Sequence, residues 1–485
     1  MSAGLAELAA EVRRDLERLN HPPPNWPLPV IGPDGRAVLD ALVVGAGMCG
    51  ETAAFALIRE GVRNIRVIDR APRGREGPWG TFARMETLRS PKHLTGPDLG
   101  VPSLTYRAWY EAEHGAEGWE ALYKIDRLDW RDYLLWVRDT IGLAVENETA
   151  LEAIEAQGSS IRARLDGPGG NEEVFARQVI LASGRDGAGG LLVPSFPSLT
   201  LPDRHGRVFH SAEDIDFERF RGGRVAVLGA SASAFDNAAT ALEAGAAAVV
   251  MDARRPHLPQ VNKSRWMAFP GYQRGFALLD DATRWRFLTY AAGEPAPPPH
   301  ESVLRCERHA GFSLRFGQVW HDVESGPDGV TIHTAAARER FDAAILGTGF
   351  AVDVARRPEL APFAGEIALW ADRVGPEEAR QHPELAAYPY LGPGFEFVER
   401  APGRCPALSR LRLFNHGATA SHGALAGDIP GLGVGATRVA QAVAHALFVE
   451  DIERHYANLV AYEEPELEPT RYYVPRADRR PSRRP

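Results

Sequence analysis

Cysteine, lysine and long apolar runs are all scarce in this chain of 485 residues, and each scarcity excludes a class of protein. The three cysteines form no CxxC pattern, which argues against a disulfide framework, a zinc site and a dithiol redox centre. No apolar run approaches the roughly 18 residues that crossing a membrane requires. The N-terminus also lacks the apolar core of a signal peptide. We therefore expect a cytoplasmic protein with no metal and no membrane partner.

Charge and length narrow the class further. Lys92, Lys124 and Lys263 are the only lysines, and all other basic residues are arginines. A net charge of −9 gives no reason to expect a nucleic-acid partner. The hydrophobic content of 44% and the charged content of 25% are those of a soluble globular protein. Because the chain is too long for one ordinary core, we expect two or three domains.

The stretch from 39 to 70, LDALVVGAGMCGETAAFALIREGVRNIRVIDR, is the strongest motif in the sequence. It predicts a buried strand, a glycine-rich turn, a helix and a second strand. Gly45 allows the tight turn, Gly47 lets a pyrophosphate approach the backbone, and Gly50 lets the helix pack closely on the strand. Asp69, nineteen residues after Gly50, can accept hydrogen bonds from a ribose diol. This order predicts a dinucleotide site, whose further contacts are three neighbouring residues: Met48, Cys49 and Arg70.

A second strand–turn–helix unit reads RVAVLGASASAFDNAATALEAGAAAVVMDARR. Gly229 and Ser231 take the first two positions of the glycine fingerprint, here written GxSxxA, and predict a second dinucleotide turn. Arg254 and Arg255 follow the strand end, and planar guanidinium groups suit the 2′-phosphate of NADP. The preceding Asp252 favours NAD unless it points away from the site. The alternative for the arginine pair is a solvated strand end.

Two further apolar strands end in small residues, at Gly184 and at Gly349. A strand end without large side chains can lie directly against a bound nucleotide, because nothing projects into that space. Two dinucleotide turns in one chain call for two dinucleotides. The physical logic is FAD held permanently by the first turn and NADPH delivered by the second. The spacing implies that the second unit is inserted into the first.

The predicted fold is therefore α/β, with two Rossmann-like domains built on doubly wound parallel sheets. The predicted domains follow the insertion: 1–35, an N-terminal helix and a proline-rich strap; 36–215, the first part of the FAD domain; 216–355, the NADPH domain; 356–470, the second part of the FAD domain with the substrate pocket; and 471–485, a basic disordered tail.

The linker GRVFHSAEDIDF, just before the second fingerprint, points to a family. With the two fingerprints it resembles the class B, two-dinucleotide flavin monooxygenases, which include flavin-containing, Baeyer–Villiger and amine N-hydroxylating enzymes. The family pattern is FxGxxxHxxxW, or FxGxxxHS in the flavin-containing branch. Gly206, His210 and Ser211 match it, whereas Arg204 replaces the Phe and Asp214 replaces the Trp. The heteroatom-oxidising branches therefore fit better than the Baeyer–Villiger branch.

The resemblance implies an NADPH- and FAD-dependent monooxygenase that uses O₂ and a small-molecule substrate. In this family NADPH reduces FAD, and O₂ then gives a flavin C4a-(hydro)peroxide that oxygenates a substrate nitrogen, sulfur or carbonyl. We expect N-hydroxylation of an amine or amino acid, with S-oxygenation or Baeyer–Villiger oxidation of a ketone as alternatives. A non-oxygenating NADPH–flavin reductase or a redox-sensing flavoprotein is the alternative of another class.

Two basic residues in the loop TLRSPKHLTGPDLGVP are the catalytic candidates. The loop is placed where the family lays a loop beside the flavin ring. Arg89 stands at the position of an Asn in flavin-containing monooxygenases, and a cation there would stabilise a developing anion. Lys92 is similar to the lysine that holds the substrate carboxylate in ornithine N-hydroxylases. For each residue, a salt bridge within the loop is the alternative.

The remaining expectations concern single residues and the N-terminus. Trp79, in GPWG, covers the flavin or belongs to the core, and Cys49 fills space at the helix start. His422 packs in the core or contacts FAD. Residues 3–19 predict an amphipathic helix that packs on the body, on a second subunit of a homo-oligomer, or on a membrane surface. Three more residues complete the predicted cofactor contacts: His210, Ser233 and Asp428.

Overall fold

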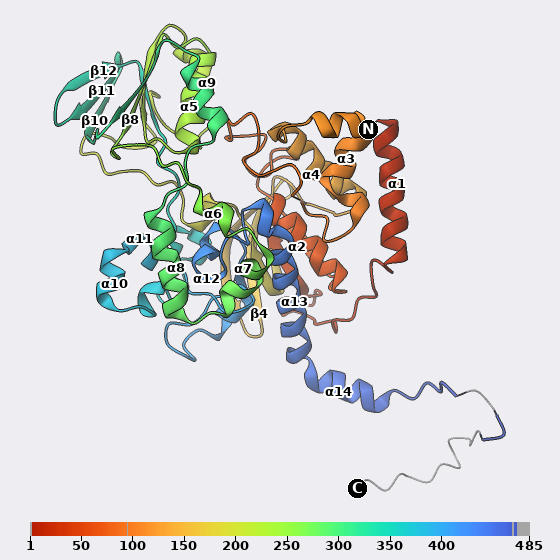
Figure 1. Ribbon diagram of the computed structural model, residues 1–485. Helices are drawn as coiled ribbons and strands as arrows, with labels where there is room; N and C mark the ends of the chain where they lie inside the picture. The colour runs from red at the N-terminus through yellow and green to blue at the C-terminus, as the bar shows by residue number, and fades with distance from the viewer. Residues whose placement is uncertain (1, 95, 468–469, 473–485) are drawn as a thin grey trace.

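Two β-sheets organise the computed structural model, which describes residues 2–94, 96–467 and 470–472 (Figure 1). Each sheet contains parallel strands around one of the two glycine turns, which confirms the predicted α/β class with two Rossmann-like units. Of the tail predicted to be disordered, only Arg471 and Tyr472 lie within the described residues.

The first sheet joins strands from distant parts of the chain in the order β2-β1-β5-β4-β3, with β14 paired to β5. Its parallel half contains β1 (Leu39–Val44), β2 (Ile65–Ile68), the end of β5 (Gly170–Leu181) and β14 (Leu411–Leu413). Its antiparallel half contains β3 (Ala150–Gln157), β4 (Ser160–Gly167) and the start of β5. Because β14 follows the second unit in sequence, its pairing with β5 makes the second unit an insertion.

The second sheet is parallel throughout, in the order β6-β13-β7-β8-β9. Its strands are β6 (Val208–His210), β7 (Arg224–Leu228), β8 (Ala248–Ala253), β9 (Phe312–Phe316) and β13 (Ala343–Leu346). β6 precedes residue 216, so this sheet begins earlier than the predicted domain boundary. A separate antiparallel sheet of three strands lies beside it, made of β10 (Trp320–Gly326), β11 (Gly329–Thr334) and β12 (Arg338–Phe341).

A layer of helices with an aromatic-rich core packs beside α2 (Met48–Arg59) of the first domain, through Met48 and Phe55 of that helix. The predicted amphipathic helix at the N-terminus packs on this layer through Leu5, Leu8 and Val12. The sequence analysis missed the second helix of the layer, because Gly115, with a φ of 72°, interrupts its periodic pattern. The layer consists of α1 (Ala3–Arg18), α3 (Tyr106–Ala121) and α4 (Arg127–Thr140).

The segment between β8 and β9 leaves the second sheet and then returns to it. Its helices α6 (Lys263–Trp266), α7 (Pro270–Gly275) and α8 (Asp281–Gly293) lie beside α12 (Thr419–His422) of the C-terminal segment (Figure 1). Trp285 of α8 stacks on Trp370 with their ring centroids 5.8 Å apart. The last helix, α9 (His300–Glu307), packs against α5 (Ala232–Glu243). The insertion therefore contributes to both halves of the molecule.

Helix α13 (Leu432–Glu450) packs on α2 (Met48–Arg59) in the centre of the first domain. With the turn before it, the span Ile429–Glu450 is a helix of 22 residues with a mean hydropathy of 1.3, long and apolar enough to cross a membrane. The expectation that no segment reaches this length is therefore wrong. Leu432, Val439 and Val443 are buried in the core of the first sheet and its neighbouring layer, which gives the apolar face a role inside the protein.

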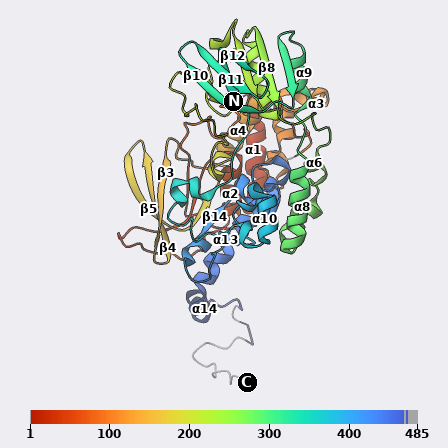
Figure 2. The same cartoon turned by 90° about the vertical axis from the view of Figure 1, so that its left-hand side faces the viewer.

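Three further α-helices belong to the described residues. After α13, α14 (Ile452–Ala461) projects from the body in both views (Figures 1 and 2). Two one-turn helices precede β14: α10 (Pro376–Gln381) and α11 (Pro383–Ala386).

Candidate active site at the junction of the two sheets

At two of the three predicted glycines of the first turn, Gly45 and Gly50, there is no room for a side chain. Gly45 has a φ of +100°, and a Cβ there would lie 2.5 Å from the carbonyl oxygen of Ala182. A Cβ on Gly50 would lie 1.7 Å from the carbonyl oxygen of Gly45, so α2 packs directly on the turn. Gly47 caps α2 and has only Gly77 nearby, with a Cβ-to-Cα distance of 3.7 Å. The open backbone and the helix N-terminus fit a pyrophosphate.

Asp69 ties the end of β2 to this turn. Its Oδ2 accepts a hydrogen bond from the Ala46 N–H at 2.7 Å, and its Oδ1 accepts one from the Ala71 N–H at 2.8 Å. Burial raises the pKa of the carboxyl group. Each carboxylate oxygen has a second lone pair, so the ribose contact stays a prediction. Arg70 instead forms an ion pair of 2.5 Å with Asp186, beyond the end of β5.

The loop with Trp79 lies over the turn, and a buried ion pair braces it. Glu76 accepts hydrogen bonds from Arg138 at 2.7 Å and from Asn147 at 2.6 Å. Gly77, the next residue, is the one that approaches Gly47. Trp79 is half-buried against the aromatic core of the helical layer. The structure therefore gives Trp79 a packing role, while its contact with flavin stays a prediction.

The ends of β5 and β14 meet at the carboxyl edge of the first sheet. Asn415 Nδ2 donates a hydrogen bond of 3.4 Å to Ser183 Oγ. The adjacent His416 Nε2 lies 3.4 Å from the hydroxyl group of Tyr388. Burial, together with the nearby Arg185, lowers the pKa of His416 to about 3, so this imidazole is neutral. These loops bring polar side chains to the edge where a parallel sheet binds its ligand.

Cys49 and Asp428 lie at the same edge. Asp428 Oδ1 is 3.7 Å from an Arg185 nitrogen, and both side chains are about half exposed. Burial raises the pKa of the Cys49 thiol to about 12, so it is protonated and unreactive at neutral pH. This supports its predicted role as a filler. Gly184, with a φ of +73°, is at the end of β5 as expected.

Arg89 spans the junction between the two domains. Its guanidinium group donates a hydrogen bond of 2.8 Å to the carbonyl oxygen of Pro297, in the inserted unit. Burial of that group lowers its pKa, and the carboxylates of Asp236 and Asp428 oppose the shift. Arg89 is therefore close to the carboxyl edge of the first sheet and to α5 of the second unit.

Lys92 has a different environment. Its ammonium group donates hydrogen bonds to the carbonyl oxygens of Trp119 at 2.5 Å and Glu120 at 3.3 Å, at the carboxyl end of α3. It also lies 4.9 Å from the centre of the Trp119 ring. A substrate carboxylate would have to compete with these helix carbonyls. Lys92 therefore fastens the loop to α3 in this structure.

The second glycine turn repeats the geometry of the first. Gly229 has a φ of +107°, and a Cβ there would lie 2.6 Å from the carbonyl oxygen of Gly347, at the end of β13. Ser231 caps α5 without a side-chain hydrogen bond, and Ser233 lies in the first turn of that helix. The open helix N-terminus again fits a phosphate group.

Asp252 points away from the second turn. Its carboxylate accepts two hydrogen bonds from Arg315, at 2.7 and 2.8 Å, and one of 2.7 Å from Trp320 Nε1. Within the described residues, the side chains of Arg254 and Arg255 form no hydrogen bond or ion pair. Since the acid is engaged elsewhere, the two arginines are the charged groups left at this strand end.

His210 links the end of β6 to the segment that follows β13. Its Nδ1 accepts a hydrogen bond from the Ala212 N–H at 3.1 Å, which leaves Nε2 as the donor to the carbonyl oxygen of Gly349 at 3.0 Å. Burial lowers its pKa. His422 is also buried, and its ring stacks on that of Phe395 with the ring centroids 3.8 Å apart. This matches one of its two predicted roles, packing in the core. For both histidines, contact with a cofactor stays a prediction.

Sequence reasoning missed several functional neighbours. Arg185 follows the predicted Gly184 directly, and its position after a small-residue strand end is a signal that was available. Arg315 and Trp320 come from strands far along the chain, so only the fold shows that they bind Asp252. Asp236, on α5, was also not singled out from the sequence. Burial raises the pKa of its carboxyl group to about 6.

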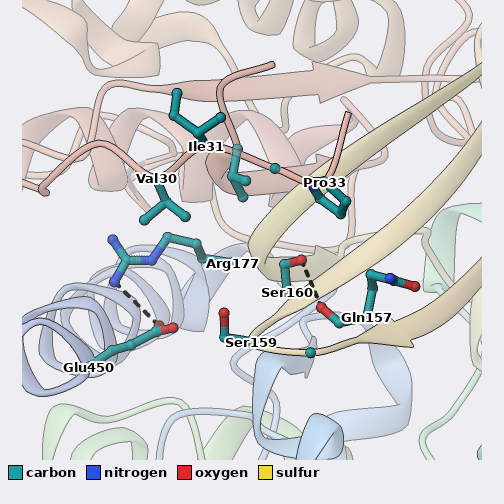
Figure 3. Close-up of a pocket in the computed structure, with 11 residues that line it drawn as sticks. Val30, Ile31, Pro33, Gln157, Ser159, Ser160, Arg177 and Glu450 are labelled. Atoms are coloured by element: carbon teal, nitrogen blue, oxygen red, sulfur yellow. Dashed lines mark hydrogen bonds and ion pairs between the residues drawn. The ribbon is translucent and has the colours of Figure 1, made fainter. Parts of the chain in front are cut away.

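A surface cavity of about 260 Å³ lies away from this junction, at the amino end of the first sheet (Figure 3). Arg177 lines it and is fully buried, 2.8 Å from Asp451 and 3.3 Å from Glu450. Its lining contains none of the residues of the two glycine turns. Among the described residues, no group of acidic, histidine or cysteine side chains could hold a metal ion.

The two glycine turns, each at the carboxyl edge of a parallel sheet, define a flavoprotein with one fold for FAD and one for NAD(P). Comparison with known proteins agrees. A family model described as FAD-NAD(P)-binding matches residues 42–186, and one described as L-lysine 6-monooxygenase/L-ornithine 5-monooxygenase matches residues 120–293. An FAD-dependent urate hydroxylase from Xanthomonas campestris pv. campestris is 43% identical over 463 residues, covering 96% of this chain and 97% of that protein. The chain belongs to this family of flavin-dependent monooxygenases.

Solved structures show the same fold at lower identity. The reduced ornithine hydroxylase from Pseudomonas aeruginosa is 15% identical, with a TM-score of 0.66 over 84% of this chain and 100% of that chain. L-lysine 6-monooxygenase from Pseudomonas syringae is 18% identical, with a TM-score of 0.62 over 84% of this chain and 99% of that chain. The predicted resemblance to the two-dinucleotide flavin monooxygenases is confirmed.

The residues present fit both cofactors. FAD supplies the oxygen chemistry when bound, and NAD(P)H supplies the hydride. The chain would hold FAD at the turn of Gly45 and Gly47, and NAD(P) at the turn of Gly229.

Proposed function

We propose that this protein hydroxylates urate in a reaction that uses FAD, NAD(P)H and O₂. The observation that carries the proposal is the 43% identity to a urate hydroxylase over 96% of the chain. An alignment of that extent includes the loop with Arg89 and the C-terminal segment as well as the cofactor folds. The relationship therefore extends to the segments that line the junction.

The side chains at the junction support a planar, polar substrate. Arg89 and Arg185 bring guanidinium groups there, and such groups both stack on planar anions and hydrogen bond to them. The neutral His416 and the hydroxyl group of Tyr388 add uncharged hydrogen-bonding partners. Urate, a planar anion at neutral pH with donors and acceptors around its edge, suits such a set.

Amine N-hydroxylation, which the sequence analysis favoured, is the second candidate. The lysine/ornithine monooxygenase match over residues 120–293 supports it. Lys92, the residue expected to hold an amino-acid carboxylate, is bonded to the carbonyl oxygens of Trp119 and Glu120. Because these carbonyl groups already occupy Lys92, an amine is the less favoured substrate.

The test is an assay of the purified holoprotein with NADPH or NADH and a substrate panel. Urate, L-ornithine, L-lysine, cadaverine, a thioether and a ketone are compared for NAD(P)H oxidation, O₂ consumption and oxygenated product. We expect urate to accelerate NAD(P)H oxidation and to be consumed in a one-to-one ratio. Coupled oxidation of an amine, with no effect of urate, would contradict the proposal. NAD(P)H oxidation without oxygenated product from any compound would favour a reductase.

We also propose NADPH as the preferred nicotinamide, because Asp252 is bonded to Arg315 while Arg254 and Arg255 carry no partner among the described residues. A cytoplasmic location and a homo-oligomeric assembly stay predictions from the sequence.

A further inference from the structure

Two of the crossings of the chain between the domains, after β5 and after β13, lie side by side. The Ala351 N–H donates a hydrogen bond to the carbonyl oxygen of Gly190, and the Asp353 N–H donates one to Ala188, each 2.9 Å long. Leu191 pairs with Phe350 as an antiparallel bridge between them. A narrow two-stranded ribbon of this kind is a hinge, because it fixes the distance between domains better than their angle.

Arg84 makes a second contact between the domains. It binds the first domain to the segment that follows β6. Its guanidinium group donates hydrogen bonds to the carbonyl oxygens of Ser211 at 2.8 Å and Glu213 at 2.7 Å, and to its own loop at Phe82. It also lies 4.9 Å from the centre of the Phe217 ring. Burial lowers its pKa to about 10, so it is charged at neutral pH.

The inserted domain also holds the main chain of Arg84. Arg305, on α9, donates a hydrogen bond of 2.9 Å to the carbonyl oxygen of Arg84. The rest of its guanidinium group binds both carboxylate oxygens of Glu243, on α5, at 2.9 and 2.6 Å. Its position is therefore fixed within the inserted domain, 3.8 Å from Asp236. Arg84 is thus bound by the inserted domain through its side chain and its backbone.

We propose that Arg84 is a positioning residue that sets the angle between the two domains for hydride transfer. The nicotinamide held at Gly229 must approach a flavin held at Gly45, and such reactions need the reacting atoms about 3–3.5 Å apart. The hinge ribbon by itself allows one domain to rotate relative to the other. Because each domain is rigid, a small rotation at the ribbon becomes a larger displacement of the groups at the junction. The fork of Arg84, bonded to carbonyl groups of fixed direction, opposes that rotation. This inference rests on the family activity and is independent of the substrate.

The test compares Arg84→Ala, Arg84→Lys and a matched control, Arg219→Ala. Arg219 also donates to a carbonyl oxygen, Gly206 at 3.1 Å, and lies 5.8 Å from the centre of the Phe209 ring, but both partners are local. Each holoprotein is mixed anaerobically with NADPH, and flavin reduction is followed at a series of NADPH concentrations. Reduction by dithionite, which needs no nicotinamide domain, is measured in parallel.

We expect Arg84→Ala to lower the limiting rate of reduction by NADPH at least about tenfold, the effect of a small misplacement of reacting groups. The flavin content, the NADPH dissociation constant and the dithionite rate should stay within about twofold of the parent. Lysine has no planar fork, so Arg84→Lys should give an intermediate rate. The control should behave like the parent protein.

A structural measurement accompanies the kinetics. Spin labels at Glu152→Cys on β3 and Asp328→Cys beside β11 report the distance between domains, with singly labelled proteins correcting for the native thiols. We expect a broader distance distribution in Arg84→Ala than in the parent. A parent-like rate and distribution in the Ala variant, or an equal loss of the dithionite rate, would overturn the proposal. If the Ala variant does not fold, a parent-like Arg84→Lys in both measurements would overturn it as well.

Discussion

At the scale of single residues, the two cofactor turns depend on close backbone approaches. A Cβ on Gly50 would meet the carbonyl oxygen of Gly45, and one on Gly229 would meet that of Gly347. Neither partner is a flexible side chain that could move aside. The acids at the ends of the following strands then differ in their roles. Asp69 binds the N–H groups around its own turn, whereas Asp252 turns away to Arg315 and Trp320.

Replacing Gly50 by alanine should remove most of the bound flavin. The added methyl group would lie 1.7 Å from the Gly45 oxygen, so the turn must move. Overpacking of this kind costs about 1–3 kcal/mol, which lowers flavin affinity roughly tenfold or more. The ratio of flavin to protein absorbance after gel filtration measures the loss. Gly365→Ala, with no atom within 4 Å of its Cβ, is the control and should keep its flavin.

Replacing Arg254 and Arg255 together by alanine should weaken the preference for NADPH. A hydrogen bond to a charged group contributes about 1.5–3 kcal/mol, so the ratio of kcat/KM for NADPH to that for NADH should fall roughly tenfold or more. Steady-state kinetics with both nicotinamides give this ratio. An unchanged ratio would assign the arginines to the solvated strand end, and the exposed Arg286→Ala serves as the control.

At the scale of elements, helix α13 is joined to the first sheet by a buried ionic cluster. Arg177, at the start of the parallel part of β5, faces Asp40 of β1 as well as Glu450 and Asp451 at the end of α13. Arg410 also binds Glu450, and Arg454 binds Asp451. Burial raises the pKa of Asp40 from 3.8 to about 6, against the attraction of Arg177.

Asp40 should make stability depend on pH in a definite direction. Between about pH 4 and 6 the folded protein keeps the proton that the unfolded chain has lost, so its free energy of unfolding falls as the pH rises. Asn cannot titrate, so Asp40→Asn should gain stability relative to the parent as the pH rises from 4 to 7. Urea unfolding at several pH values measures the difference.

The matched control has the opposite sign. The exposed carboxyl group of Asp34 has a lowered pKa because it accepts hydrogen bonds from Arg36. Its contribution to stability is present above its unfolded pKa and is lost as the pH falls. Asp34→Asn should therefore lose stability relative to the parent as the pH rises. A parallel pH dependence of the two variants would contradict the role of Asp40.

At the scale of the whole molecule, the inserted unit is held at more than its hinge. The helices α6 to α8 extend from it to the C-terminal segment (Figure 1). There Trp285 stacks on Trp370, and the neighbouring Arg284 donates hydrogen bonds to the carbonyl oxygen of Ser421 and the hydroxyl group of Tyr390. The two domains therefore share a packed interface in addition to the contacts of Arg84.

Trp285→Ala should destabilise this shared interface. Trp285 is 7% exposed, and truncating a buried aromatic side chain costs about 3–5 kcal/mol. Thermal unfolding should show a lower midpoint or two separate transitions, as the domains lose their coupling. Trp266→Ala on α6, at a position that is 63% exposed, is the matched control and should change stability by less than about 0.5 kcal/mol.

The sequence by itself determined the two Rossmann units, their order, the insertion of one into the other and the family. These follow from local patterns: glycines where a positive φ or a close approach is needed, and apolar runs of strand length beside them. Gly184 and Gly349 lie beyond the strand ends with positive φ values, and their contact with a nucleotide stays a prediction.

Only the tertiary structure decided which side chains meet. Asp252 is paired by Arg315 and Trp320, which are 63 and 68 residues away in sequence. Lys92 is paired by carbonyl groups at the end of α3 that are 27 and 28 residues away. The path of α6 to α8, the contact of Arg89 with Pro297 and the contacts of Arg84 with the inserted domain likewise join segments that no local pattern relates. Hydrogen bonds and ion pairs of this kind depend on the packing of whole domains, so sequence spacing carries no signal for them.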